Sequence, residues 1–158
     1  MDKVGGFDET FIRNQDSELN IRLRKAGCQV WLDPRLIVEY RPRPSLRSLA
    51  RQYWDYGWWR AITIHRHPDS IKLRQAAVPV AVVGLAGTVV LGIVVQPWLL
   101  LAPAAYGVSL IGAVVREPRE MTLQEKATMV AALATMHVMW GTGLIASVLA
   151  HTARGWSQ

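Results

Sequence analysis

The chain has 158 residues, 51% of them hydrophobic, and a formal net charge of +6. The charges are distributed unevenly, because no Asp, Glu, Lys or Arg occurs in residues 76–115 or 127–153. A soluble domain interleaves charged and apolar residues, so this division excludes an ordinary soluble domain and indicates membrane spans. The single cysteine, Cys28, excludes an internal disulfide framework and fits a reducing compartment, where it would be a small apolar residue near the start of a strand.

Residues 1–40 are predicted to be a fragment of an α/β domain. A helix is expected over residues 16–27, because apolar side chains recur on one face and a glycine stands at its end. Two short strands are expected at 28–32 and 36–40, on either side of an Asp33-Pro34 turn.

Residues 41–75 are basic, aromatic and amphipathic. Ser45 can cap a helix on which four large residues share one side: Leu46, Leu49, Tyr53 and Tyr56. The Trp58-Trp59 pair is typical of the aromatic belt at a membrane surface, so we expect a helix lying in the headgroup layer. The basic residues could indicate nucleic acid, but anionic lipid beside a membrane span already explains them, and no nucleic-acid partner is expected.

Three transmembrane helices are predicted next. Residues 76–95 and 98–115 are each long enough, at about 1.5 Å per residue, to cross about 30 Å of hydrocarbon. A third span covers residues 127–150, and residues 151–158 form a short tail. The spans imply the lipid bilayer as a partner.

The positions of Lys and Arg predict the orientation. These residues gather before the first span and in the loop of residues 116–126, whereas the Gln96-Pro97 turn has none and the tail has only Arg154. Cytoplasmic loops carry the excess of Lys and Arg, and the N-terminus shows no apolar secretory signal. We therefore expect a multi-pass protein of the inner (cytoplasmic) membrane, with the N-terminal region in the cytoplasm and the tail outside.

The first stretch that carries chemistry is Gly5-Gly6-Phe7-Asp8-Glu9, followed by Gln15-Asp16 at the start of the expected helix. The helix dipole and free backbone amides favour the ionised form of Asp16, which could also be only a helix cap. With Glu18-Leu19, Arg22-Leu23-Arg24 and Asp33-Pro34, the run resembles the C-terminal half of the catalytic domain of family 2 glycosyltransferases of the GT-A type. In particular, it is similar to the membrane-bound bacterial branch that builds succinoglycan-like exopolysaccharide. The resemblance covers residues 1–75, and the trailing spans fit it.

This resemblance implies roles for individual residues. Asp16 would be the general base that takes the proton from the acceptor hydroxyl, whose oxygen attacks the anomeric carbon of a nucleotide sugar and inverts it. Many relatives have a second carboxylate where this chain has Gln15, so Asp16 is the only carboxylate at that pair. Gly6, Asp8 and Glu9 would line the acceptor side of the pocket; for the two carboxylates, a capped polar turn is the alternative.

A second run, residues 51–60, resembles the Gln-Tyr-x-x-Tyr-Gly segment of the same relatives. It implies that Gln52, Tyr53 and Tyr56 lie near the acceptor, where aromatic rings stack on sugar faces; anchoring at the membrane surface is the alternative. Processive polysaccharide synthases carry Gln-x-x-Arg-Trp here. The Arg-Trp part is absent from this chain, which argues against processive synthesis.

Donor and metal binding are expected to lie outside this sequence. In GT-A enzymes an N-terminal βαβ half binds the nucleotide, and an Asp-x-Asp pair holds Mg²⁺ or Mn²⁺, which offsets the charge of the leaving diphosphate. No Asp-x-Asp occurs in the chain, and His65 and His67 have no cysteine or carboxylate cluster beside them in the sequence. We therefore expect no metal in this chain alone.

The expected function is that of a membrane-bound glycosyltransferase fragment, whether a split-gene product, an internal start or a truncation. The complete enzyme would use a nucleotide sugar, a glycan or glycolipid acceptor, and Mg²⁺ or Mn²⁺. The fragment would be inactive without the missing N-terminal nucleotide-binding half, and a separate protein that supplies this half is one possible partner. The alternative is a small non-enzymatic membrane protein that serves as an assembly or regulatory subunit.

Overall fold

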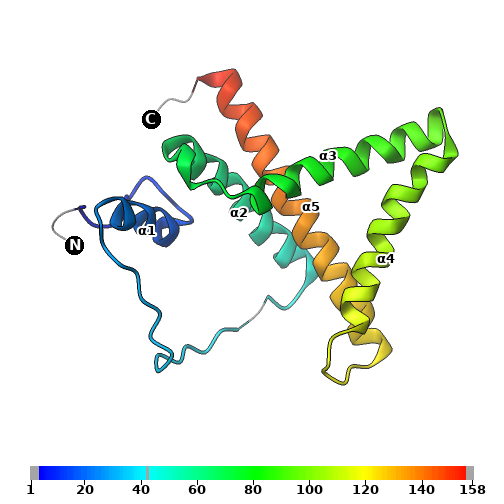
Figure 1. Ribbon diagram of the computed structural model, residues 1–158, viewed down its shortest axis with the longest axis horizontal. Coiled ribbons are helices and arrows are strands. Elements are labelled where there is room, and N and C mark those ends of the chain that lie inside the picture. Colours follow the sequence, from blue (N-terminus) through cyan, green and yellow to red (C-terminus); the bar gives the residue numbers. More distant parts are fainter. Residues whose placement is uncertain (1–3, 42, 156–158) are drawn as a thin grey trace.

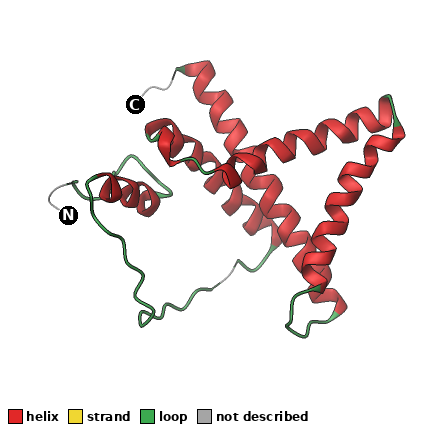
Figure 2. Ribbon diagram, viewed as in Figure 1, coloured by secondary structure: helices red, strands yellow, loops and turns green. Residues whose placement is uncertain are grey.

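All the regular secondary structure among the described residues is helical. The computed structural model describes residues 4–41 and 43–155 (Figures 1 and 2). Among them are five α-helices and two short 3₁₀ helices, which follow one another as α1 (Gln15–Lys25), α2 (Leu46–Arg66), η1 (Pro68–Ser70), α3 (Leu73–Val94), η2 (Pro97–Leu100), α4 (Leu101–Val115) and α5 (Leu123–Arg154).

The prediction of an α/β fragment is wrong. No strand occurs among the described residues, and residues 28–32 and 36–40 run through a wide loop that leaves the helices (Figure 2). Their apolar side chains lie in solvent, with Leu32 92% and Ile37 90% exposed. A strand needs a neighbouring strand to satisfy its backbone, and the described part of this chain offers none. The β-branched and aromatic residues therefore favour an extended conformation locally, but no described segment pairs with them to form a sheet.

The helix predicted at residues 16–27 is confirmed as α1, and it ends as its sequence predicts. Gly27 adopts a left-handed conformation, with φ of 79°. Its N–H donates to the carbonyl of Arg24, and the Cys28 N–H donates to the carbonyl of Leu23 at 2.9 Å. This pair of hydrogen bonds satisfies carbonyls that the helix end would leave free, and it favours glycine at the reversal.

The amphipathic helix after Ser45 is also present, as α2. Ser45 accepts a hydrogen bond from the Ser48 N–H at 3.2 Å, which caps the first turn. The helix then packs along the C-terminal half of α5 at a very short distance. A Cβ on Gly57 would lie 2.9 Å from the backbone nitrogen of Leu144, and one on Gly143 would lie 3.1 Å from the Cα of Trp54. Glycines at these positions allow the two backbones to approach. Burial of α2 in the headgroup layer remains a prediction.

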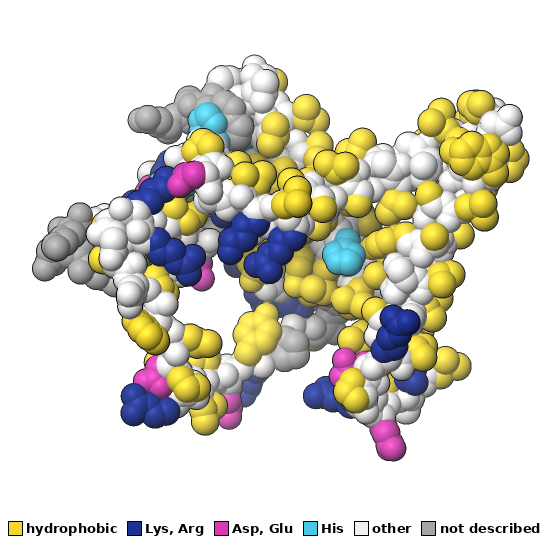
Figure 3. Space-filling view, viewed as in Figure 1, with side chains coloured by type: hydrophobic (Ala, Val, Ile, Leu, Met, Phe, Trp, Pro, Cys, Tyr) yellow, Lys and Arg dark blue, Asp and Glu magenta, His cyan; other side chains and the backbone are white. Residues whose placement is uncertain are grey.

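Three helical segments among the described residues are long and apolar enough to cross a membrane. They have mean hydropathies of 2.4, 1.9 and 1.5 and comprise Leu73–Val94, Pro97–Val115 and Leu123–Arg154. The apolar side chains of α3 and α4 cover the outside of the molecule (Figure 3), as expected for surfaces that contact lipid.

The three long helices outline a triangle rather than a parallel bundle (Figure 1). A Cβ on Gly141 of α5 would lie 3.4 Å from the Cα of Pro79, near the start of α3. α3 leads away to the η2 turn, and α4 returns to the start of α5. α5 begins at a cap in which Thr122 and Glu125 exchange hydrogen bonds; at about 1.5 Å per residue it is about 48 Å long, more than a bilayer core requires.

Candidate functional site

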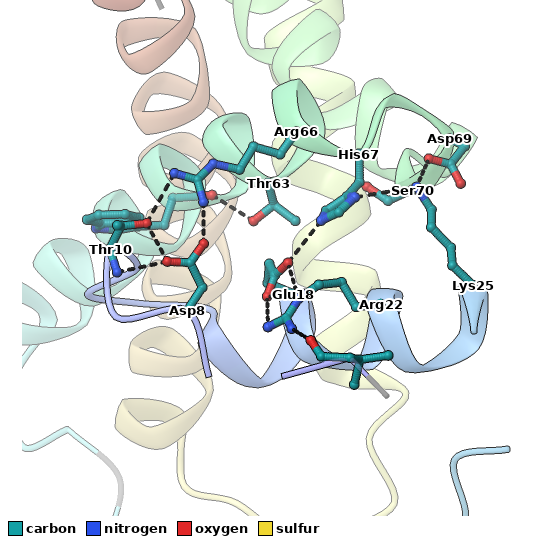
Figure 4. A network of polar contacts seen from close by, with 12 residues as sticks. Asp8, Thr10, Glu18, Arg22, Lys25, Thr63, Arg66, His67, Asp69 and Ser70 are labelled. Atoms are coloured by element: carbon teal, nitrogen blue, oxygen red, sulfur yellow. Dashed lines mark hydrogen bonds and ion pairs between the residues drawn. The ribbon is translucent and has the colours of Figure 1, made fainter. Parts of the chain in front are cut away.

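The N-terminal module, residues 4–27, docks on the end of α2 and on η1. Three polar contacts join segments that are far apart in the sequence (Figure 4). Glu18 lies within hydrogen-bond distance of His67. Asp8 forms an ion pair with Arg66, and Lys25 forms one with Asp69 at 2.7 Å. These contacts set the position of α1, and with it Asp16, relative to the membrane helices.

Glu18 is the centre of this docking. The residue is 2% exposed, and its carboxylate accepts hydrogen bonds from Arg22 at 2.7–2.9 Å and lies 3.0 Å from His67 Nε2. Burial raises the pKa of Glu18, but the hydrogen bonds from Arg22 and His67 outweigh it and leave the pKa below its ordinary value. Arg22 also donates to the carbonyls of Gly6 and Val4, so the glycine loop is tied to the same carboxylate.

Asp8 belongs to a second part of the interface. Its Oδ1 accepts hydrogen bonds from the Thr10 N–H at 2.9 Å and the Thr10 hydroxyl at 2.6 Å. These bonds, assisted by Arg66, lower the pKa of Asp8. The Arg66 guanidinium lies 4.7 Å from the ring centroid of the fully buried Phe11, which packs against Trp59. Asp8 therefore caps a turn and holds the module, which favours the structural alternative for this residue.

Asp16 lines a pocket of about 670 Å³ between the N-terminal module and the membrane helices. Side chains of α1, α2 and α5 contribute to it; among its lining residues are Phe7, Asn14, Asp16, Tyr56, Arg60 and Trp140. Asp16 is exposed in the first turn of α1, and the N-cap of that helix is Asn14, in a left-handed conformation. Asp16 is thus not the cap, and its carboxylate is accessible from the pocket.

The structure brings only some of the predicted site residues together. Asp16 and Tyr56 share the pocket, and Phe7 of the glycine loop joins them. The other predicted residues do not line it: Gly6, Asp8, Glu9, Gln52 and Tyr53. The roles assigned to these residues remain predictions.

Gln52 and Tyr53 do not line the pocket, but both contact Tyr56, which does. The buried Gln52 donates to the Tyr56 hydroxyl at 2.7 Å and accepts from Arg43 Nε at 3.1 Å. The Tyr53 ring meets the Tyr56 ring edge-on, with centroids 5.7 Å apart. Both residues are therefore placed to position Tyr56.

Sequence reasoning missed Glu18 and Arg60 as residues that build this site. Glu18 and Arg22 stand four apart, the spacing of a helical ion pair, and this was the available signal. No local pattern distinguishes Arg60 from the other basic residues around it. Among the described residues, no group of three His, Cys, Asp or Glu side chains could hold a metal ion.

Comparisons with known proteins give a consistent picture. Over 144 residues, 89% of its length, the chain is 36% identical to the succinoglycan biosynthesis protein ExoA of Rhizobium meliloti, of which it covers 42%. Over 66 residues it is 38% identical to pre-mycofactocin glycosyltransferase of Mycobacterium tuberculosis, covering 42% of this chain and 14% of the relative. No family model and no solved structure matches.

A third relative acts on a lipid-linked sugar, according to its name. It is the dolichyl N-acetyl-alpha-D-glucosaminyl phosphate 3-beta-D-2,3-diacetamido-2,3-dideoxy-beta-D-glucuronosyltransferase of Methanococcus voltae, 32% identical over 60 residues, which are 38% of this chain and 19% of the relative. The chain thus spans less than half the length of each of these relatives. Together they show that this chain, with its three helices able to span a membrane, is related to glycosyltransferases.

Proposed function

We propose that the chain forms the acceptor side and the membrane part of an inverting glycosyltransferase. The complete enzyme moves a sugar from a nucleotide sugar to a polysaccharide or glycolipid acceptor. The observation that carries this proposal is the shared pocket of Asp16 and Tyr56, which lies where the N-terminal module meets the helices that can span a membrane.

Asp16 is the proposed general base. An exposed carboxylate at the wall of the pocket accepts the proton of an acceptor hydroxyl while that oxygen bonds to the anomeric carbon. The bond from that carbon to the diphosphate breaks in the same step, and the nucleoside diphosphate leaves with its electron pair. Proton transfer to a positioned group contributes about 10²–10⁴-fold to such a rate. Tyr56 offers an aromatic edge or face to the sugar.

Donor binding is proposed to come from a further part of the enzyme, either in the same polypeptide or in a partner. The relatives are more than twice as long as the region that matches this chain. Among the described residues no group of three His, Cys, Asp or Glu side chains could hold a metal ion, and the roles proposed for this chain are those of its own side chains. We further propose that the enzyme lies in the inner membrane, with the N-terminal module in the cytoplasm.

The names of the relatives support two acceptor classes. The Rhizobium meliloti protein is named for succinoglycan, a polysaccharide, and the Methanococcus voltae protein for a dolichyl phosphate-linked sugar, a glycolipid. A glycolipid presents its acceptor hydroxyl close to a membrane, which fits a pocket beside helices that can span one.

The test is reconstitution. The part of the Rhizobium meliloti relative that lies outside the matched region is joined to this chain, and transfer of labelled sugar to membrane lipid or polysaccharide is measured in vesicles with Mg²⁺ or Mn²⁺. We expect turnover from the joined protein and none from this chain alone. A joined protein that folds and binds donor but transfers no sugar would favour the alternative, a non-enzymatic assembly or regulatory subunit.

A further inference from the structure

We propose that a basic pocket beside Arg60 binds the phosphate or diphosphate group of a ligand. This inference goes beyond the proposed sugar transfer, because it concerns an anion site that this chain builds by itself. The observation behind it is that the guanidinium of Arg60 is buried with no counter-charge among the described residues.

Arg60 is buried without a counter-charge. The residue is 8% exposed, and the pKa of its guanidinium is lowered because burial disfavours the charged form. In the described part of the chain it has no ion pair with a carboxylate. Its Nη2 donates only to neutral oxygens, those of Ser70 and Gln75, and its buried Nε has no hydrogen-bond partner among the described residues. A buried unpaired charge is costly, and a bound anion would remove most of that cost.

The surroundings of Arg60 attract anions. A pocket of about 530 Å³ lies beside it, between α1 and the start of α3. Four basic and two acidic side chains line this pocket: Arg24, Lys25, Arg60, Lys72, Asp16 and Asp69. Lys25 and Asp69 pair with each other, so three cations and a single carboxylate remain. Basic side chains also gather on the surface where the N-terminal module faces α2 and the start of α3 (Figure 3).

Phosphate is the ligand class that fits this arrangement. The Arg60 guanidinium lines the pocket and offers charge and N–H donors to phosphate oxygens, and the side chains of Arg24 and Lys72 add positive charge around it. Asp16 lies on the wall shared by this pocket and the Asp16–Tyr56 pocket, so a bound phosphate would lie next to the proposed base. Lys72 is the N-cap residue of α3, where the first candidate span begins, so the phosphate belongs either to a lipid headgroup or to a soluble diphosphate.

The test uses the full 158-residue chain in detergent with two probes. Inorganic pyrophosphate binding is measured by calorimetry, and native mass spectrometry compares retention of phosphatidic acid with that of phosphatidylcholine. Each measurement is repeated for Arg60→Gln and for Lys72→Gln, the latter at an exposed position. Arg47→Gln is the control, because Arg47 is an exposed residue of α2, the helix that contains Arg60, and does not line the basic pocket. Circular dichroism verifies that each variant keeps its helices.

We expect Arg60→Gln to weaken binding at least tenfold, Lys72→Gln to weaken it about threefold, and Arg47→Gln to leave it within twofold of wild type. Binding of pyrophosphate indicates a soluble ligand, whereas selective retention of phosphatidic acid alone indicates a lipid; both support the site. If neither probe binds, or if both Arg60→Gln and Lys72→Gln bind as wild type does, the proposal is overturned. Such a failure leaves the sugar-transfer proposal intact, because that proposal is tested by turnover of the joined enzyme.

Discussion

Glu18 and His67 stand 49 positions apart in the sequence, yet Glu18 Oε1 lies 3.0 Å from His67 Nε2. This contact joins α1 to the turn that leads from α2 into the first span. Asp16 precedes Glu18 by two residues in the same helix, so the contact that docks the module also holds Asp16 at the wall of its pocket.

Replacing Glu18 should undock the module. In Glu18→Gln the half-buried Arg22 loses its anionic partner, at a cost of about 1–2 kcal/mol, which corresponds to roughly tenfold easier opening. Amide hydrogen exchange in α1 should accelerate accordingly, while exchange in α3 stays unchanged. Glu39→Gln, at an exposed loop position, is the matched control and should leave exchange unchanged. Equal protection of α1 in wild type and Glu18→Gln would contradict the proposed role of this carboxylate.

Docking of the module should also depend on pH. The pKa of Glu18 is lowered in the docked state because hydrogen bonds from Arg22 and His67 outweigh burial, and the pKa of Asp8 is lowered by Thr10 and then Arg66. A lowered carboxyl pKa stabilises the docked state above the ordinary value, about 4.3 for Glu, and the stabilisation is lost as the pH falls through the docked value.

The fluorescence of Trp59, which packs against Phe11 of the module, can report this transition. We expect a change in the acid range below about pH 4.3 that is smaller in Glu18→Gln, because glutamine does not titrate. A wild-type transition centred above the ordinary glutamate pKa would contradict the sign of the shift.

The contact between α2 and α5 should tolerate no side chain at Gly57. The added methyl of Gly57→Ala meets backbone atoms of Trp140 and Leu144, which cannot move aside as a flexible side chain does. The helices must separate, and we expect a loss of about 2–3 kcal/mol and a clear drop in Tm. Gly87→Ala is the control, since no heavy atom lies within 4 Å of its added Cβ, and helix propensity should leave its Tm unchanged or higher. Thermal unfolding in detergent, followed by circular dichroism, compares the two; equal Tm values would show that this close contact is not kept in solution.

The side of the membrane on which the tail lies separates two interpretations. The count of Lys and Arg predicts an outside tail, whereas the rings of Trp58 and His151 lie 5.7 Å apart and bring the end of α5 beside α2. We therefore expect His65→Cys, near the end of α2, and Thr152→Cys, in a Cys28→Ser background, to react with an impermeant maleimide from the same side. Labelling from opposite sides would mean that α2 and the end of α5 separate in the bilayer.

Local sequence signals predicted the helices well. The helix end at Gly27, the helix cap at Ser45 and the apolar spans are determined by residues close together in the chain, so these features can be predicted from the sequence alone. Whether the two predicted strands form could not be predicted in the same way. Residues 28–32 and 36–40 have the composition of strands, but a strand exists only through pairing, and pairing depends on distant segments.

The site was only partly predictable for the same reason. Similarity to glycosyltransferases pointed to Asp16 and Tyr56, which do share a pocket, although no local spacing relates them. The acceptor role of Asp8 stays a prediction, while its contacts with Thr10 and Arg66, which the sequence did not predict, make it part of the docking interface. The burial of Glu18 and Arg60 follows from the docking of α1 and the start of α3 on α2, which no pattern within either segment specifies.

The most direct measurement of the central claim is sugar turnover by Asp16→Asn in the joined enzyme. Asparagine keeps the size of the side chain but cannot take the proton, and the N-cap of α1 is Asn14, so the helix should be unaffected. We predict that turnover falls by about 10²–10⁴-fold while donor binding changes less than twofold. Asp33→Asn, outside the pocket, should keep full turnover. An Asp16→Asn enzyme that retained more than about a tenth of wild-type turnover would contradict the assignment of Asp16 as the general base.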